Sequence, residues 1–386
     1  MPDPSLYVGR EQTYVKHFFL ERYLERVAYN IYSFQNDFVY VDGFSGPWKS
    51  AAENYKDTSF NLALDQLRAV RKGQKERRGK DVTFRCLFVE KDPRAFAELK
   101  TTVASIDDVP IELINGKFED HIADAVKFVG HSFSLIFIDP TGWTGYPLQK
   151  ITPLLKLRGE VLINFMSDHI NRFIDDPRPN IAQQFDDLFG AAWFDDWKVL
   201  HDSGMTREAA AIKVYTERLK MAGGYAHVTS TRILKPKSDR TYFYLIYATR
   251  HRKGIEEFRA IEQKAVDVQE SLRNDVKYQA AVLRSGQPGL FGAAIANGAV
   301  ATYEDERKIQ LEQAHAKLLE LLRARSDGLS FGDLIGPVME TPLTWKSDLN
   351  GWIKELKEQG KIEVFGMTPR ERTLKPGHLI VLRGTV

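Results

Sequence analysis

The stretch SLIFIDPTGW (134–143) decides how the first half of the chain is interpreted. Its first five residues are apolar or small, which is typical of a strand buried on both faces of a parallel sheet. Asp139 then leaves that strand, and Pro140 cannot continue a ladder of backbone hydrogen bonds. Because a carboxylate at the end of a buried strand requires a partner or a function, we expect Asp139 to lie in an active-site crevice.

Four similar apolar runs surround this stretch, at residues 38–41, 83–90, 111–116 and 160–165. They alternate with helical patterns, and such repetition of strand, helix and strand predicts a parallel sheet with helices on both faces. Residues 227–251 contain two β-rich runs around KPKSD, which predict a hairpin at the edge of the sheet. The expected fold class is therefore α/β, with a doubly wound sheet and a C-terminal edge hairpin.

The end of the first expected strand carries a candidate ligand-binding turn. In an open parallel sheet, ligands bind outside the carboxyl ends of the strands. Asp42 ends the strand and is followed by Gly43, Phe44 and Gly46, whose glycines allow a tight turn and close approach of a ligand to the backbone. Glycines after a strand are also common in any α/β fold.

The next two strands end in further candidates. Glu90 is placed to accept hydrogen bonds from both ribose hydroxyls of a nucleoside, although a solvated strand-end acid would have the same position. Phe118 is a candidate to stack on adenine, and Glu119 or Asp120 to accept from its exocyclic amine. Acidic residues at a helix start would give the same pattern.

Bulk composition excludes few classes of protein. The 386 residues include 54 basic and 52 acidic side chains, so net charge gives no sign of nucleic-acid binding. One cysteine, Cys86, allows neither an internal disulfide nor a thiolate cage, and three histidines (His121, His131 and His169) lack metal-ligand spacing. We predict no metal, no membrane segment, and a reducing, cytoplasmic location.

The distribution of strand-like, helical and Gly/Ala-rich segments divides the chain into three parts. They are the α/β domain with the candidate site over 1–265, a helix and Gly/Ala-rich linker over 266–304, and a small domain over 305–386. The last part is expected to contain three helices and two strands, the order of a winged helix. Winged helices bind DNA and also dock on proteins. The 13 basic and 12 acidic side chains of this part favour neither role.

Two further segments have alternative interpretations. Residues 68–80 carry seven basic side chains against one acidic, but they precede the second strand, so we expect a solvated loop at the amino edge of the sheet rather than a phosphate-binding patch. The segment from Gln287 to Phe291, QPGLF, has the spacing of peptides that dock on bacterial sliding clamps. Five residues match such a pattern easily by chance.

Four motifs together resemble class I S-adenosyl-L-methionine-dependent methyltransferases, and more closely the three-Cys-motif partner (TcmP) family. They are VKHFFLERYL (15–24), YVDGFSGP (40–47), FVEKDP (88–93) and FIDPTGW (137–143). The resemblance covers roughly residues 10–250 and implies a Rossmann-like fold. It also implies S-adenosyl-L-methionine as cofactor and, as partner, a separate protein with a three-cysteine motif.

The same order of motifs is also similar to bacterial adenine-N6 methyltransferases that act on 23S ribosomal RNA. That resemblance implies that Asp139 and the Pro140 carbonyl hold the target amine, and that Trp143 stacks on the base. It further implies that Lys16 and His17 line the cofactor or substrate side.

The same resemblance implies that Ser59 lies near the methionine end of the cofactor. This sequence departs from the pattern of the ribosomal-RNA enzymes at two places. Thr141 stands where the second proline of the family's loop is expected and Gly142 where its aromatic is expected, so Trp143 arrives one residue later. Pro47 and Trp48 replace the small residues usual after the first glycine pair.

Three functions are consistent with the sequence. The first is methyl transfer to an amine of RNA or DNA, with Asp139 positioning the nucleophile rather than ionising it. The second is a catalytically weak partner or regulator of a three-cysteine-motif protein. The third is a regulator that binds DNA through residues 305–386.

Overall fold

The chain forms two compact units. The computed structural model describes residues 3–46, 55–285, 292–368 and 370–383, with side chains described outside 284–302. One unit comprises Met1–Val228 and Arg232–Arg250, and the other Thr229–Thr231 and His251–Val386. The division falls at residue 250, fifteen residues before the expected end of the first domain, because Ile255 belongs to the hydrophobic core of the second unit.

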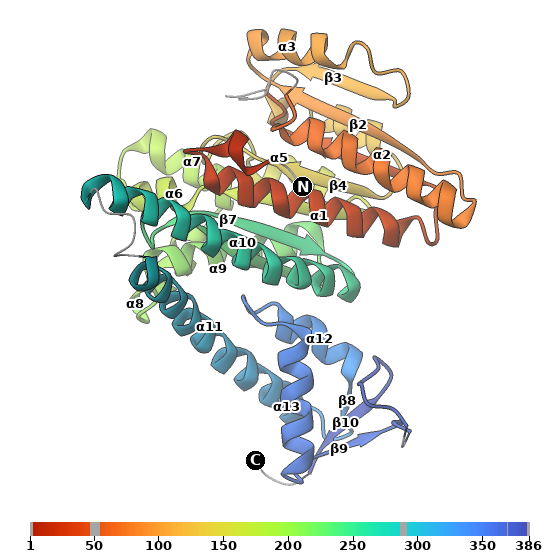
Figure 1. The fold of residues 1–386 in the computed structure, drawn as a ribbon, viewed down its shortest axis with the longest axis vertical. Coiled ribbons are helices and arrows are strands. Elements are labelled where there is room, and N and C mark those ends of the chain that lie inside the picture. The colour runs from red at the N-terminus through yellow and green to blue at the C-terminus, as the bar shows by residue number, and fades with distance from the viewer. Residues whose placement is uncertain (1–2, 47–54, 286–291, 369, 384–386) are drawn as a thin grey trace. The chain divides into compact units, whose positions relative to one another are not determined.

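A seven-stranded sheet with the order β3-β2-β1-β4-β5-β7-β6 forms the centre of the first unit (Figure 1). Strands β1 to β5 are parallel, whereas β7 runs antiparallel to β5. The prediction of an α/β sheet with an edge hairpin is confirmed, and the first five strands end within one residue of their expected bounds. The strands are β1 (Asp37–Asp42), β2 (Thr83–Glu90), β3 (Ile111–Asn115), β4 (Ser134–Ile138), β5 (Gly159–Phe165), β6 (His227–Leu234) and β7 (Thr241–Thr249).

Helices cover both faces of this sheet. Helices α1 and α2 lie on one face, where Tyr32 contacts Phe38 and Phe60 contacts Phe88. Helices α4, α5 and α9 share a core with the other face. The helices are η1 (Pro4–Tyr7), α1 (Glu11–Ile31), α2 (Ser59–Arg78), α3 (Pro93–Val103), η2 (Phe118–Asp120), α4 (Ile122–Val129), α5 (Leu148–Leu155), α6 (Ser167–Phe173), α7 (Pro179–Phe189), α8 (Trp193–Asp202) and α9 (Arg207–Gly223).

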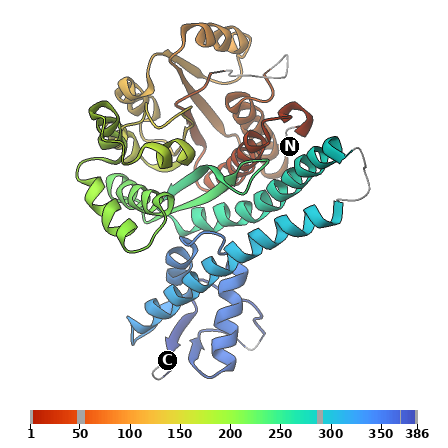
Figure 2. The same cartoon turned by 90° about the vertical axis from the view of Figure 1, so that its left-hand side faces the viewer.

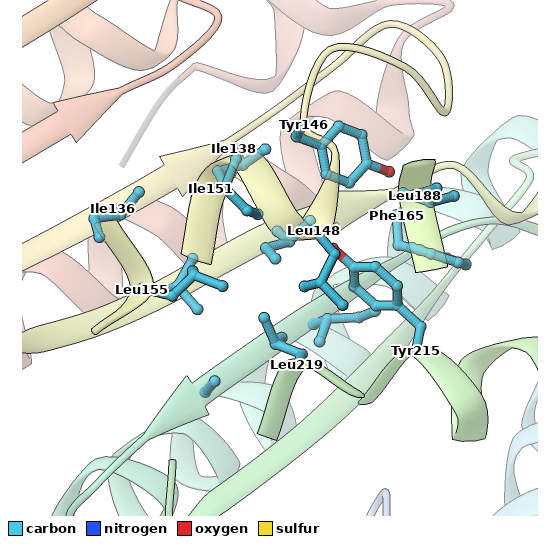
Figure 3. Packing of buried hydrophobic residues seen from close by; sticks show 14 of the residues in the cluster. Ile136, Ile138, Tyr146, Leu148, Ile151, Leu155, Phe165, Leu188, Tyr215 and Leu219 are labelled. Atoms are coloured by element: carbon cyan, nitrogen blue, oxygen red, sulfur yellow. The ribbon is translucent and has the colours of Figure 1, made fainter. Parts of the chain in front are cut away.

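Strand β4 is the buried centre of the fold. All five of its residues are buried, as the continuous apolar run predicts for a strand covered on both faces. Figure 3 shows Ile136 and Ile138 of β4 in the same cluster as Ile151 of α5 and Tyr215 of α9. Gly159 begins β5 where a Cβ would lie 2.2 Å from the Ser134 carbonyl oxygen, so only glycine lets β5 pair with β4 there.

The basic segment 68–80 corrects one expectation. It forms the C-terminal half of α2 and not a loop, because Leu67, Val70 and Gln74 are buried at helical spacing. Helix α2 ends at Gly79, whose φ of 63° is a left-handed conformation that favours glycine. The basic side chains therefore project from the exposed side of a helix.

The second unit contains two long helices followed by a small mixed domain. Helices α10 and α11 pack against each other (Figure 2). Helix α11 begins at Gly292, within the Gly/Ala-rich stretch expected as a linker, whereas the segment from Gln287 to Phe291 lies outside the described residues. The elements are α10 (Arg252–Ser285), α11 (Gly292–Arg323), β8 (Leu329–Ser330), α12 (Phe331–Met339), α13 (Lys346–Glu358), β9 (Ile362–Phe365) and β10 (Leu379–Leu382), with the strands in the order β8-β10-β9.

No helix in the described part of the chain is long and apolar enough to span a membrane. The histidine, cysteine, aspartate and glutamate side chains described form no group of three or more that would hold a metal ion. Cys86 is buried in β2 with a free thiol.

Candidate functional site

Three neighbouring parallel strands end around one cavity. In the sheet, Asp42 of β1 pairs with Phe88 of β2 and with Phe137 of β4, so Glu90 and Asp139 lie just beyond this level on either side. A cavity of about 370 Å³ opens at this edge. Its lining residues are Gly43, Phe44, Val89, Glu90, Lys91, Gly116, Lys117, Phe118, Glu119, Asp139, Thr141, Gly142, Trp143, Thr144, Gly145, Pro147, Gln184, Asp187 and Leu188.

Asp42 organises the turn after β1 from a fully buried position. Its carboxylate accepts hydrogen bonds from the Ser59 hydroxyl at 2.6 Å and from the Phe44 backbone N–H at 3.0 Å. Burial raises the pKa of Asp42 to about 6, against the opposing effect of these two donors. Asp42 and Ser59 are thus paired with each other, and neither is among the residues that line the cavity.

The glycine turn brings backbone close to an aromatic ring. A Cβ at Gly43 would lie 3.0 Å from the Phe118 ring, so a larger residue would displace that ring from the cavity wall. Gly46 is half-buried at the end of the described turn, and Pro47 and Trp48 lie outside the described residues.

Glu90 lines the cavity from the end of β2. Only 3% of the residue is exposed, and burial raises the pKa of its carboxyl group. Its Oε1 accepts from the Asp92 backbone N–H at 2.6 Å, while its backbone carbonyl accepts from the Gly116 N–H and the Asn115 side chain. These bonds fix the position of Glu90 at the cavity.

The segment after β3 supplies an aromatic ring and an acid. Phe118 is 2% exposed and its ring centroid lies 5.8 Å from that of Phe44. The Glu119 carboxylate lines the cavity, with the Lys150 ammonium 3.9 Å away. Phe44, Phe118 and Glu119 therefore border the cavity on the side of Glu90.

Asp139 is held between two side chains from distant parts of the sequence. The Lys16 ammonium of α1 donates to its Oδ2, and the Asn164 side-chain amide of β5 donates to its Oδ1 at 2.6 Å. The side chains of Lys16 and Asp139 are 10% and 15% exposed, so little solvent screens the attraction between the two charges. Asp139 lines the cavity with its orientation fixed from two directions.

His17 lies on α1 beside Lys16, away from the cavity lining. It is buried, and its Nδ1 shares a 2.9 Å hydrogen bond with the Tyr7 hydroxyl. Burial, with a smaller effect of the Lys16 charge, holds the pKa of His17 well below its usual range. A neutral His17 therefore connects η1 to α1.

Trp143 forms a cavity wall within an aromatic cluster. Its ring is parallel to that of Phe185, with centroids 5.8 Å apart, and lies 5.4 Å from that of Phe173. The indole N–H donates to the Gln184 side-chain oxygen at 3.0 Å. These contacts anchor Trp143 and cover one of its faces.

Sequence reasoning missed Asn164 and Gln184. Asn164 is the next-to-last residue of β5, so a search for polar residues close to the strand ends, and not only after them, would also have found it. Gln184 is one of several polar residues on α7, and its role depends on a contact with Trp143, 41 residues earlier, that no local pattern predicts.

Comparisons with known proteins add the following. Neither a protein-family model nor a curated protein matches this sequence. The chain is similar in structure to a Legionella pneumophila protein, with a TM-score of 0.34 and 10% identity over 60% of this chain and 84% of that chain. It is also similar to an O-methyltransferase from Bacillus cereus in complex with SAH (TM-score 0.31, 11% identity, 59% of this chain and 80% of that chain). A third similar structure is loganic acid methyltransferase with SAH (TM-score 0.31, 8% identity, 78% of this chain and 90% of that chain).

At TM-scores of 0.31 to 0.34 these similarities do not assign the fold, which is assigned from the strand order of the chain itself. A doubly wound, mostly parallel sheet with a cavity at its carboxyl edge defines a Rossmann-like fold.

Proposed function

We propose that the first unit binds S-adenosyl-L-methionine in the carboxyl-edge cavity and transfers its methyl group to a nucleic-acid amine, adenine N6. The observation that carries this proposal is that Glu90 and Asp139, from strands on either side of β1, line one cavity. The strand order with an antiparallel β7 is typical of class I methyltransferases and supports the same class as the four sequence motifs.

The residues at the Glu90 side of the cavity fit the cofactor. A volume of about 370 Å³ lies within the usual range of small-molecule sites. Glu90 would accept from the ribose hydroxyls, and Phe118 would contact the adenine ring, with Glu119 beside it. Gly43 leaves room for close approach of the nucleoside to the backbone.

The Asp139 side fits a methyl acceptor. S-adenosylmethionine supplies, when bound, an electrophilic methyl group on a positively charged sulfur. A carboxylate has about four lone-pair sites, so Asp139 can hold Lys16 and Asn164 and still accept a hydrogen bond from an amine N–H. With the Pro140 carbonyl it would orient the amine without ionising it, because an aromatic amine is far too weak an acid.

The test compares Asp139→Ala with wild type in two measurements: calorimetry with S-adenosylhomocysteine, and methyl incorporation into adenine-containing RNA and DNA. We expect cofactor affinity to change little and transfer to fall by about 10²-fold or more, because orientation is lost. No binding of S-adenosylmethionine or S-adenosylhomocysteine to wild type would overturn the proposal.

A second candidate is a catalytically weak partner of a three-cysteine-motif protein. The anchoring of Trp143 favours it, since Phe185 already lies parallel to one face of the ring and leaves less of that ring for a substrate base. In this case a partner would copurify with the chain, and no nucleic acid would accept a methyl group. Gain of transfer in Phe185→Ala, which uncovers that face, would support this explanation, whereas methyl transfer by the wild-type chain would count against it.

For residues 305–386 we propose a winged helix that assists in substrate binding. The order α11, β8, α12, α13, β9 and β10 supports this assignment, with α13 as the recognition helix. Lys354 and Lys357 lie on α13, and Lys375 lies in the loop between β9 and β10. The expected result is DNA or RNA binding that weakens in Lys354→Ala/Lys357→Ala. A sequence-specific DNA footprint that persists without residues 1–250 would instead identify a regulator.

A further inference from the structure

A second feature lies at the same sheet edge as the cavity. The register of β5 with β7 pairs Phe165 with Tyr244 and Val161 with Ala248 in antiparallel orientation. Strand β7 therefore begins where β5 ends, and the turn between β6 and β7 lies at the carboxyl edge. Helix α6, which starts at Ser167 after β5, lies beside β7 at this edge.

Cationic side chains gather on α6, on the segment between α6 and α7, and on the β6–β7 turn. We call them the α6 surface: Arg172, Arg178, Lys235, Lys237 and Arg240, with the rings of Phe173 and Tyr242. Three of the cations approach the Asp168 carboxylate, with nitrogen–oxygen distances of 2.9 Å for Lys235, 3.7 Å for Arg240 and 3.8 Å for Arg172. One carboxylate thus holds α6 and the β6–β7 turn together.

The charges of this surface differ in how far they reach into solvent. The Arg172, Arg178 and Arg240 side chains are 64%, 60% and 73% exposed. The Asp168 and Asp176 side chains that pair with them are 16% and 18% exposed. Asp168 and Asp176 are covered, whereas Asp175 and Asp239 on the same segments are exposed, so these segments carry five cations against four carboxylates. The three guanidinium groups are more exposed than Asp168, Asp175 and Asp176 and project outward, and they give the α6 surface its positive character.

Aromatic rings lie beneath these cations. The guanidinium groups of Arg172 and Arg178 lie 5.9 Å and 6.0 Å from the centre of the Phe173 ring, and the Lys235 ammonium 5.9 Å from that of Tyr242. Phe173 in turn contacts Trp143 at the cavity wall. Cations interleaved with half-buried rings are typical of surfaces that bind single-stranded nucleic acid.

We propose that the α6 surface binds the phosphate backbone of a single-stranded nucleic acid and leads one of its bases past Phe173 to the cavity at Asp139. This inference rests on the proposed function and adds where its substrate binds. The arginines neutralise phosphates, while the rings accept bases by stacking. A nucleic-acid strand that follows the rings from Phe173 to Trp143 arrives at the loop that contains Asp139.

Helix α2 provides a matched control. It carries six cations against the five of the α6 surface. Arg68 and Arg71 are paired with Asp108, which precedes β3, and Lys75 with Asp81, which precedes β2. This places the α2 cations at the amino edge, opposite the cavity. Lys72, Arg77 and Arg78 are exposed there.

The experiment measures binding of labelled single-stranded RNA and DNA of one sequence to the full chain by fluorescence anisotropy over a range of NaCl concentrations. We compare wild type with the triple variant Arg172→Ala/Arg178→Ala/Arg240→Ala and with the control Lys72→Ala/Arg77→Ala/Arg78→Ala. The first variant should bind at least ~10-fold more weakly. The slope of its log binding constant against log NaCl concentration should become shallower by about 2 to 3, close to one for each lost phosphate contact. The control should match wild type.

The possible outcomes separate this inference from the proposed function. The proposal for the α6 surface is wrong if wild type does not bind oligonucleotides, or if both triple variants lose the same oligonucleotide affinity. It is also wrong if the chain binds heparin but not oligonucleotides. Calorimetry with S-adenosylhomocysteine on the same proteins tests the cofactor site separately and also verifies that the variants are folded. If the chain binds oligonucleotides through the α6 surface but transfers no methyl group, the inference about the α6 surface stands and the proposed methyltransferase activity is wrong.

Discussion

The Asn164 side-chain amide donates a 2.6 Å hydrogen bond to Oδ1 of Asp139. The two residues follow Ile163 and Ile138, which pair directly in the parallel register of β5 and β4. Asn164 is 3% exposed, and its own Oδ1 is buried with no hydrogen-bond partner among the described residues. Because Lys16 holds the other carboxylate oxygen, Asn164 completes the positioning of Asp139.

Asn164→Asp should place a second carboxylate against that of Asp139. Repulsion between the two carboxylates should turn the Asp139 side chain away from its present orientation. We expect methyl transfer to fall by about 10²-fold, because small displacements of a positioning group have effects of that size. Affinity for S-adenosylhomocysteine should stay close to wild type. The control is Asn36→Asp, an exposed residue that precedes β1 at the amino edge of the sheet, which should retain activity. An equal loss of cofactor affinity and of transfer in Asn164→Asp would contradict the positioning role.

Asp42→Asn should change how stability depends on pH. The folded pKa of Asp42, about 6, is above its value of 3.8 in an unfolded chain, so the folded state favours the protonated form. The contribution of this group to stability is therefore greatest below the unfolded pKa and is lost as pH rises through the folded pKa. Two pKa units correspond to about 3 kcal/mol.

Urea unfolding of wild type and Asp42→Asn from about pH 4 to about pH 7 tests this expectation. The free energy of unfolding of the variant minus that of wild type should increase by about 3 kcal/mol over this interval, because only wild type must bury the charge. Other carboxyl groups titrate in both proteins and cancel in the difference. A difference independent of pH would show that Asp42 has an ordinary pKa.

Glu90→Gln tests the nucleoside side of the cavity. The substitution keeps the shape of the side chain but removes its charge, so bonds from ribose hydroxyls to the carboxylate weaken. We expect S-adenosylhomocysteine to bind roughly 10- to 100-fold more weakly, the size of one or two charge-assisted hydrogen bonds. Glu98→Gln, exposed on α3, is the control. Unchanged calorimetric affinity in Glu90→Gln would remove Glu90 from the cofactor site.

Tyr23→Phe tests how α1, which carries Lys16, is attached to the sheet. The Tyr23 hydroxyl donates to the buried carboxylate of Glu160 at 2.6 Å. Loss of this donor should lower the free energy of unfolding by about 1–3 kcal/mol, because a buried charge loses a hydrogen bond. Thermal or urea unfolding measures the change against Tyr29→Phe on the same helix, which is half-buried. Equal stability of the two variants would mean that Glu160 does not depend on Tyr23.

Local sequence pattern predicted the parallel strands, because a strand buried on both faces is an almost continuous apolar run and most of its polar residues lie at or near its ends. The run SLIFI with Asp139 after it, and the acids Asp42 and Glu90 at their strand ends, were therefore identified without coordinates. The same reasoning was wrong about residues 68–78. There the basic side chains concealed a helical spacing of buried residues.

Only the tertiary structure decided which groups meet Asp139. Lys16 is 123 residues from Asp139 along the chain, and Asn164 is 25 residues away. Their approach depends on how α1 packs on the sheet and on the register between β4 and β5. The same holds for the parallel rings of Trp143 and Phe185 and for the joining of α6 to the β6–β7 turn through Asp168. Periodicity specifies which face of an element is buried, whereas contacts between distant elements arise from the packing of those faces against one another.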